Sequence, residues 1–126
     1  EYPEGLRYHR EHDWARIDDG EAVLGITWYA QDALGEVVFF DPPAVGASVT
    51  KDQSYAEVES VKAVSDVFAP LSGEIVEVNA ELADSPERIN ADPYGDGWMI
   101  KVRMTDPSEA DKLMDAAAYR EMLETG

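Results

Sequence analysis

The chain contains no cysteine among its 126 residues, which excludes disulfides, thiolate metal sites and cysteine nucleophiles. Any sulfur redox chemistry must therefore come from a group attached to the chain. Long apolar runs are also absent, because none approaches the roughly 20 residues that a membrane-spanning helix needs. Residues 1–5 have neither the basic nor the apolar region of a secretory signal. We therefore expect no secretion and no membrane association.

Basic residues are scarce. The chain has 10 Lys and Arg against 27 Asp and Glu, for a formal net charge of −17. So few cations cannot neutralise a run of phosphates, which excludes a nucleic-acid-binding protein. The acidity has two interpretations, steering of basic protein partners or support of solubility alone, and composition does not decide between them.

Several chemical motifs are missing as well. The sequence has no glycine-rich phosphate loop and no serine nucleophile elbow. His9 and His12 are three positions apart, but in a strand or coil this spacing does not bring the rings together, and no third ligand is marked. We therefore expect no metal site. Trp14, Trp28 and Trp98 are too scattered for a stacking platform and are expected to pack in the core or at its rim.

One lysine stands at the centre of a strand pattern. In residues 55–70 apolar and polar side chains alternate on both sides of Lys62, which predicts two strands joined by a hairpin turn. A turn exposes its side chains to other proteins. Glu57, Glu59 and Asp66 flank the lysine. We therefore expect the Lys62 side chain to be exposed at this turn and accessible to other proteins.

The residues around this lysine form a specific motif. They read Glu59-Ser60-Val61-Lys62-Ala63, followed by Ser65-Asp66 and by Ala69-Pro70-Leu71-Ser72-Gly73. Together with His12-Asp13-Trp14 and residues 90–98, this motif resembles the glycine cleavage system H protein family over nearly the whole chain. Biotin carriers have methionines where Val61 and Ala63 stand here. The lipoyl domains of 2-oxoacid dehydrogenase acyltransferases usually have Asp-Lys-Ala and continue into linkers.

The resemblance implies a carrier and not an enzyme. Lipoate would be attached covalently to Lys62 by lipoate-attaching enzymes. The arm would accept an aminomethyl group from glycine at P protein (glycine decarboxylase) and present it to T protein (aminomethyltransferase) for transfer to tetrahydrofolate. L protein (dihydrolipoamide dehydrogenase) would reoxidise it. The resemblance further implies a monomer in a prokaryotic cytoplasm, or in the mitochondrial matrix if the chain is a processed eukaryotic one.

The resemblance also assigns roles to other residues. Glu59 would present a carboxylate to the attaching enzyme, the alternative being a solvated charge at a strand edge, and Ala63 completes the motif. Asp13 and Asp66 would line a cleft that receives the loaded arm and keeps its amine protonated. The chain departs from the family pattern at Asp13, where glutamate is usual. It also departs at Trp28 and Ala33, where polar residues are frequent.

Two other functions remain open at this stage. An H-like protein could donate lipoate to other carriers within lipoate metabolism. A binding module of the same fold could leave Lys62 unmodified.

Periodicity alone supports a compact antiparallel β protein. The resemblance makes it a biotinyl/lipoyl-carrier-like barrel-sandwich hybrid of two small antiparallel sheets, with a short helix after the first hairpin and C-terminal helices. We expect one domain, residues 1–126. Besides the two strands around Lys62, strands are expected at residues 14–17, 21–26, 37–40, 74–79 and 98–104.

The helices are predicted from their end signals. Thr27 and Gly35 are placed to begin and end a helix over residues 28–34. One helical turn is expected from Ser85, with Pro86 at its first position. A capping box of Asp106 and Glu109 begins the next helix. The last helix, residues 116–123, is capped by Asp115, and its Tyr119, Met122 and Leu123 share one face.

Overall fold

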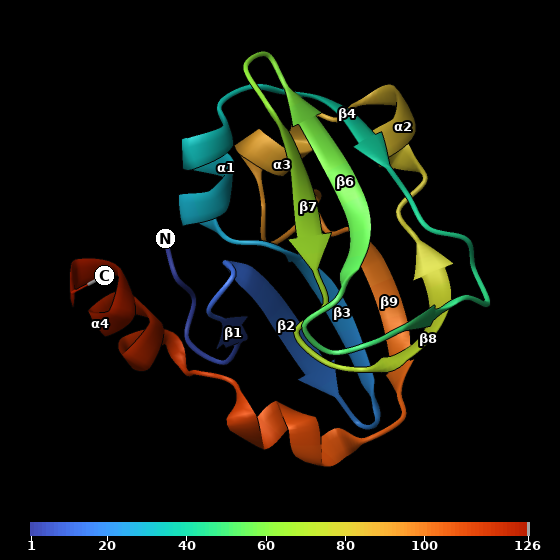
Figure 1. Cartoon of the computed structure of the whole chain (residues 1–126), viewed down its shortest axis with the longest axis vertical. Coiled ribbons are helices and arrows are strands. Elements are labelled where there is room, and N and C mark those ends of the chain that lie inside the picture. Colours follow the sequence, from blue (N-terminus) through green and yellow to red (C-terminus); the bar gives the residue numbers. More distant parts are fainter. Residues whose placement is uncertain (126) are drawn as a thin grey trace.

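The structure, a computed structural model, describes residues 1–125 and is mainly β, with two antiparallel sheets (Figure 1). The predicted fold class is confirmed. The larger sheet has the strand order β1-β2-β3-β9-β8-β5 and the smaller one β4-β6-β7. The strands are β1 (Arg7–His9), β2 (Asp13–Asp18), β3 (Glu21–Ile26), β4 (Val37–Asp41), β5 (Ser48–Val49), β6 (Ser54–Ser60), β7 (Val64–Phe68), β8 (Gly73–Val78) and β9 (Ile100–Met104).

The helices are short and lie outside the sheets (Figure 1). They are α1 (Trp28–Leu34), α2 (Glu81–Asp84), α3 (Arg88–Ala91), the 3-10 helix η1 (Pro107–Lys112) and α4 (Ala116–Thr125). Helix α1 packs against α3, and α4 packs against β1. Within residues 1–125 no helix is both long enough and apolar enough to cross a membrane.

The main core lies between the two sheets and is built by alternation along the strands. In β6, for example, Val58 is buried while Glu57 and Glu59 are exposed, as expected for a sheet with one covered face. Leu24 of β3 and Phe40 of β4 join Val58 in the same apolar cluster. The β6–β7 hairpin is therefore anchored in this core through Val58.

A second, aromatic cluster ties the C-terminal helix to the larger sheet. The rings of Tyr8 and Tyr119 stack with centroids 4.9 Å apart, and Trp14 is buried beside them. Trp14 pairs with Gly25 across β2 and β3, where a Cβ atom would lie 2.7 Å from the indole. Glycine at position 25 therefore leaves room for this ring. Of the other tryptophans, Trp28 and Trp98 are half-buried, so the expected core or rim packing is confirmed.

The predicted helix over residues 28–34 is confirmed, together with both of its end signals. The Oγ1 atom of Thr27 accepts the N–H of Ala30, and Gly35 adopts a positive φ of 80° after the last turn. The α4 prediction also holds, because Asp115 Oδ1 accepts the N–H of Ala118 at 2.8 Å. These signals act within one helical turn, so the sequence alone specifies them.

Two predictions in the region between β8 and α4 hold only in part. The helical turn expected from Ser85 is present as α3, but it begins at Arg88, two residues after Pro86. Asp106 does cap η1, yet Glu109 does not complete a capping box. Its carboxylate instead accepts the N–H of Ser72 at 2.7 Å and the hydroxyl of Ser72 at 3.0 Å. A tertiary partner has replaced the local one.

Candidate functional site

The lysine motif forms the turn of the β6–β7 hairpin, at the top of Figure 1. Strand β6 ends at Ser60 and β7 begins at Val64, with Glu59 and Val64 as the last paired residues. Ser60 is buried, and its Oγ accepts the N–H of Lys62 at 3.2 Å and that of Ala63 at 3.1 Å. The serine of the motif therefore holds the turn, a role that the sequence did not reveal.

Lys62 is exposed at the tip of this hairpin. Within residues 1–125 no carboxylate lies within 4 Å of its ammonium group. The turn is fixed to the loop after α1, because the N–H of Val61 donates to the carbonyl of Glu36 at 3.0 Å. A Cβ atom at Gly35 would lie 3.6 Å from Lys62 Cε, so the lysine stem passes close to this glycine. The backbone of the turn is held while the amine is accessible.

A cleft of about 350 Å³ lies beside the hairpin, between β7 on one side and α1 and the β1–β2 turn on the other. Ala63, the residue after the lysine, lines it, as do Asp13 and Asp66. Its other lining residues are Glu11, His12, Ile26, Tyr29, Ala30, Ala33, Leu34, Val58, Val64, Ser65, Val67 and Phe68. The structure therefore brings Ala63, Asp13 and Asp66 to one cavity. Lys62 lies next to Ala63 at the hairpin tip, and Glu59 lies on the exposed face of β6.

Asp13 is the most unusual group in this cleft. It is 1% exposed, and its Oδ2 has no hydrogen-bond partner. Desolvation by burial, helped by the nearby Glu11 carboxylate, raises the pKa of Asp13 well above its ordinary value. Asp13 therefore keeps its proton at pH values where an exposed aspartate has lost it. A ligand that supplies a donor or a positive charge would relieve this cost.

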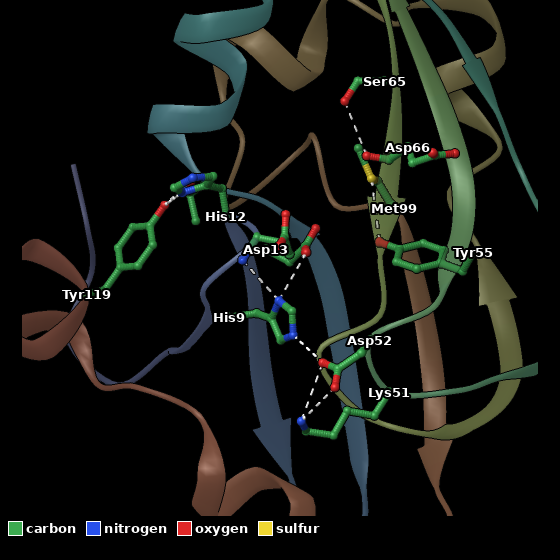
Figure 2. A network of polar contacts seen from close by, with 12 residues as sticks. His9, His12, Asp13, Lys51, Asp52, Tyr55, Ser65, Asp66, Met99 and Tyr119 are labelled. Carbon is green, nitrogen blue, oxygen red and sulfur yellow. Dashed lines mark hydrogen bonds and ion pairs between the residues drawn. The ribbon is translucent and has the colours of Figure 1, made fainter. Parts of the chain in front are cut away.

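Asp66 is placed differently. It is exposed, and its Oδ1 accepts the hydroxyl of Ser54 at 3.1 Å. Figure 2 shows its carboxylate directed away from Asp13, toward β6. On β7 the neighbouring Ser65 is half-buried and pairs with Val58, which also lines the cleft. Strand alternation thus turns the Ser65 side chain, and not the Asp66 carboxylate, toward the covered face of the sheet.

The apolar wall of the cleft was missed by sequence reasoning. Ala30, Ala33 and Leu34 of α1 line it together. Their i, i+3, i+4 spacing is typical of one helix face and was a signal that could have found this wall. Ala33, one of the departures from the family pattern, thus contributes a methyl group to the cleft. No pattern in the sequence marks Ser65 as a residue that lines the cleft. Within residues 1–125 no group of three or more His, Cys, Asp or Glu side chains could hold a metal ion.

Comparison with known proteins identifies the family. The family model described as glycine cleavage H-protein matches residues 6–126. The glycine cleavage system H protein of Halorhodospira halophila is 52% identical over 122 residues, covering 96% of this chain and 94% of that protein. Its counterpart from Anaeromyxobacter dehalogenans is 53% identical over 124 residues, covering 98% and 97%.

A solved structure agrees with these relatives. The crystal structure of a glycine cleavage system H protein from Mycobacterium marinum has a TM-score of 0.90 and 41% sequence identity. The match covers 97% of this chain and 98% of that one. Members of this family are carrier components and not catalytic enzymes. The chain therefore belongs to the glycine cleavage H-protein family.

Proposed function

We propose that this chain is a single lipoyl-carrier domain of the glycine cleavage system and that its arm is attached to Lys62. The main observation behind the proposal is that the Lys62 amine is accessible at a hairpin tip. The backbone of this tip is fixed because the N–H groups of Lys62 and Ala63 donate to the buried Ser60 hydroxyl. Its partners would be P protein, T protein, L protein and the lipoate-attaching enzymes. The relatives named above are bacterial, which favours the cytoplasm over the mitochondrial matrix as the place of action.

The cleft fits the proposed group. A lipoyl-lysine arm is a long apolar chain with a polar end, and the cleft begins at Ala63, directly after the lysine. Its apolar walls suit the chain of the arm. The orphaned Oδ2 of Asp13 offers a buried acceptor for the polar end. The residues present therefore match the chemistry of such an arm.

The bound lipoyl group supplies a sulfur pair that can carry a one-carbon amine unit and be oxidised and reduced. The residues of this chain do the rest. The hairpin presents the attachment point to several enzymes in turn. The apolar cleft walls would pack on the arm, and the buried Asp13 carboxyl would accept a hydrogen bond from its amine. Asp66 also lines the cleft, but its carboxylate is exposed and accepts the hydroxyl of Ser54.

The surface next to Lys62 offers contacts for the visiting enzymes. Val61 and Val64 are 66% and 60% exposed, although both are apolar. Glu59 lies between Phe39 of β4 and Val64 of β7 on the exposed face of the small sheet. We propose that the apolar side chains bind the attaching enzyme and that Glu59 directs it to the lysine.

Intact mass spectrometry after expression in a lipoate-competent host tests the proposal. The wild-type protein should show the lipoyl increment and Lys62→Arg should show none, with both folded by circular dichroism. Lys51→Arg and Lys101→Arg are the matched controls and should still be modified. Modification of the Lys62→Arg protein would contradict the assignment. Reconstitution with P protein and labelled bicarbonate then separates glycine cleavage from a lipoate-donor role, because only the former fixes the label.

A further inference from the structure

Tyr119 of α4 connects two parts of the chain that form the cleft. Its hydroxyl lies 2.7 Å from His12 Nδ1 and 2.8 Å from Thr27 Oγ1, and Figure 2 shows it reaching the ring of His12. His12 lines the cleft, and Thr27 is the N-cap of α1, which forms the apolar wall. The C-terminal helix thus contacts residues that form the cleft, although Tyr119 itself is not among the lining residues.

These contacts determine which atom carries each proton. Thr27 is fully buried, and its Oγ1 already accepts the N–H of Ala30 at 3.3 Å. Its own proton needs an acceptor, and within residues 1–125 the Tyr119 oxygen is the one in reach. Tyr119 then has its own proton for His12 Nδ1. The reverse direction would leave a buried hydroxyl proton without an acceptor, at a cost of about 1–3 kcal/mol.

The ring proton of His12 therefore lies on Nε2. Desolvation by burial lowers the pKa of His12, which favours the neutral ring. Nε2 has no hydrogen-bond partner within residues 1–125. The residue is held in a left-handed backbone conformation, φ 74°, and its ring packs at 4.5 Å on that of Tyr29. Such a conformation costs a non-glycine residue about 1–3 kcal/mol and persists where the surroundings require it.

We propose that Tyr119 is a positioning residue for the cleft, because it holds His12 as the Nε2–H tautomer and so makes the ring a hydrogen-bond donor to the lipoyl arm. For the identity of the occupant, this inference rests on the proposed function. The arm offers acceptors in its amide oxygen and its sulfur atoms. Asp13 offers the complementary acceptor for an amine. His12 would thus donate a hydrogen bond to the arm, and the neighbouring Asp13 would accept one from it.

The tautomer can be measured in unlipoylated, ¹⁵N-labelled protein by long-range ¹H–¹⁵N correlation of the His12 ring. We expect Nδ1 to give the signal of an unprotonated nitrogen and Nε2 that of a protonated one. A protonated Nδ1, or a mixture of both forms, would overturn the proposal. This experiment does not depend on lipoylation and needs no variant.

Tyr119→Phe then removes the hydroxyl while keeping the ring. Tyr8→Phe is the matched control, since the Tyr8 ring stacks on that of Tyr119 and its hydroxyl donates to the Pro3 carbonyl instead. Only Tyr119→Phe should give a mixture of tautomers. An unchanged tautomer in Tyr119→Phe, or the same mixture in Tyr8→Phe, counts against the proposal.

Lipoylation provides the last measurement. In the wild type it should shift the His12 Nε2 resonance, and in Tyr119→Phe this shift should be smaller, because part of the population then carries the ring proton on Nδ1. If lipoylated wild-type protein leaves the His12 resonances unmoved, the arm does not use this donor and the inference fails. Intact mass of the same sample reports attachment, so that failure is distinct from a failure of the proposed function.

Discussion

His9 and Asp13 face each other without forming a hydrogen bond. His9 Nδ1 lies 3.9 Å from Asp13 Oδ2, but it accepts the N–H of Glu11 at 3.1 Å. The ring proton is therefore on Nε2, which donates to Asp52 Oδ1 at 2.6 Å (Figure 2). Asp13 is left buried without a hydrogen bond from His9, and burial makes its charged form costly.

The cost of ionising Asp13 should appear in the pH dependence of stability. The pKa of Asp13 is raised in the folded state, whereas that of an unfolded aspartate is about 3.9. Between these two pKa values the folded chain binds more protons than the unfolded one. The free energy of unfolding therefore falls as pH rises, by about 1.4 kcal/mol per pH unit for this group. The contribution is fully present below the unfolded pKa.

Asp13→Asn removes this titration. We expect the variant to have a higher Tm than the wild type at pH 7, and the difference to shrink toward pH 4, where both side chains are neutral. Thermal unfolding by circular dichroism between pH 4 and pH 8 measures it. Asp66→Asn, at an exposed position, should follow the wild-type curve. Parallel curves for wild type and Asp13→Asn would show that Asp13 ionises freely in the fold.

Ser60→Ala should loosen the lysine turn. The variant loses the acceptor of two backbone N–H groups, those of Lys62 and Ala63, and we expect a loss of about 1–2 kcal/mol in stability. A disordered turn should also be a poorer substrate, so lipoylation should slow. Ser65→Ala, in the same hairpin, is the control. Unchanged denaturant midpoints and lipoylation rates would mean that the conformation of the turn does not depend on the Ser60 hydroxyl.

Glu59→Ala should slow lipoylation severalfold while changing stability by less than about 0.5 kcal/mol, as is usual for exposed charges. Glu57→Ala is the matched control, because Glu57 is exposed on the same strand two residues further from Lys62. Initial rates of lipoylation followed by mass spectrometry distinguish the two. Equal rates for both variants would mean that Glu59 is only a solvated charge.

Sequence reasoning predicted those parts of the fold whose causes are local. The caps at Thr27 and Asp115 and the hairpin at Lys62 depend on interactions within a few residues, and all three are confirmed. The capping box at Glu109 failed because Ser72, distant in sequence, supplies better donors. A local pattern cannot show that a long-range partner competes for the same carboxylate.

The same distinction between local and long-range interactions applies to the candidate site. The lysine motif could be found by eye, but burial of Asp13 and the direction of the Asp66 side chain depend on how β2 and β7 pack. The link from Tyr119 to His12 joins residues 107 positions apart. No periodicity or spacing predicts such a contact, because it exists only once α4 has docked on β1.

The structure also ranks the two carboxylates that the family resemblance treats together. Asp13 is buried in the cleft without a partner, whereas Asp66 is exposed and bound to Ser54. A charge-assisted contact in a buried site is worth about 1.5–3 kcal/mol, and one in water is worth far less. On the proposed function, we therefore expect Asp13 to make the stronger contact with the amine of the loaded arm.

We accordingly expect Asp13→Asn to shorten the lifetime of the loaded protein roughly tenfold or more, and Asp66→Asn to have little effect. The lipoylated variants would be loaded by P protein and glycine, separated from the enzyme, and followed by the release of ammonia. The two substitutions are matched, since each replaces a carboxylate by an amide of the same size. If Asp66→Asn shortens the lifetime as much as Asp13→Asn, the protection comes from the negative charge around the cleft and not from the buried contact. Equal lifetimes for both variants and the wild type would mean that neither carboxylate protects the amine.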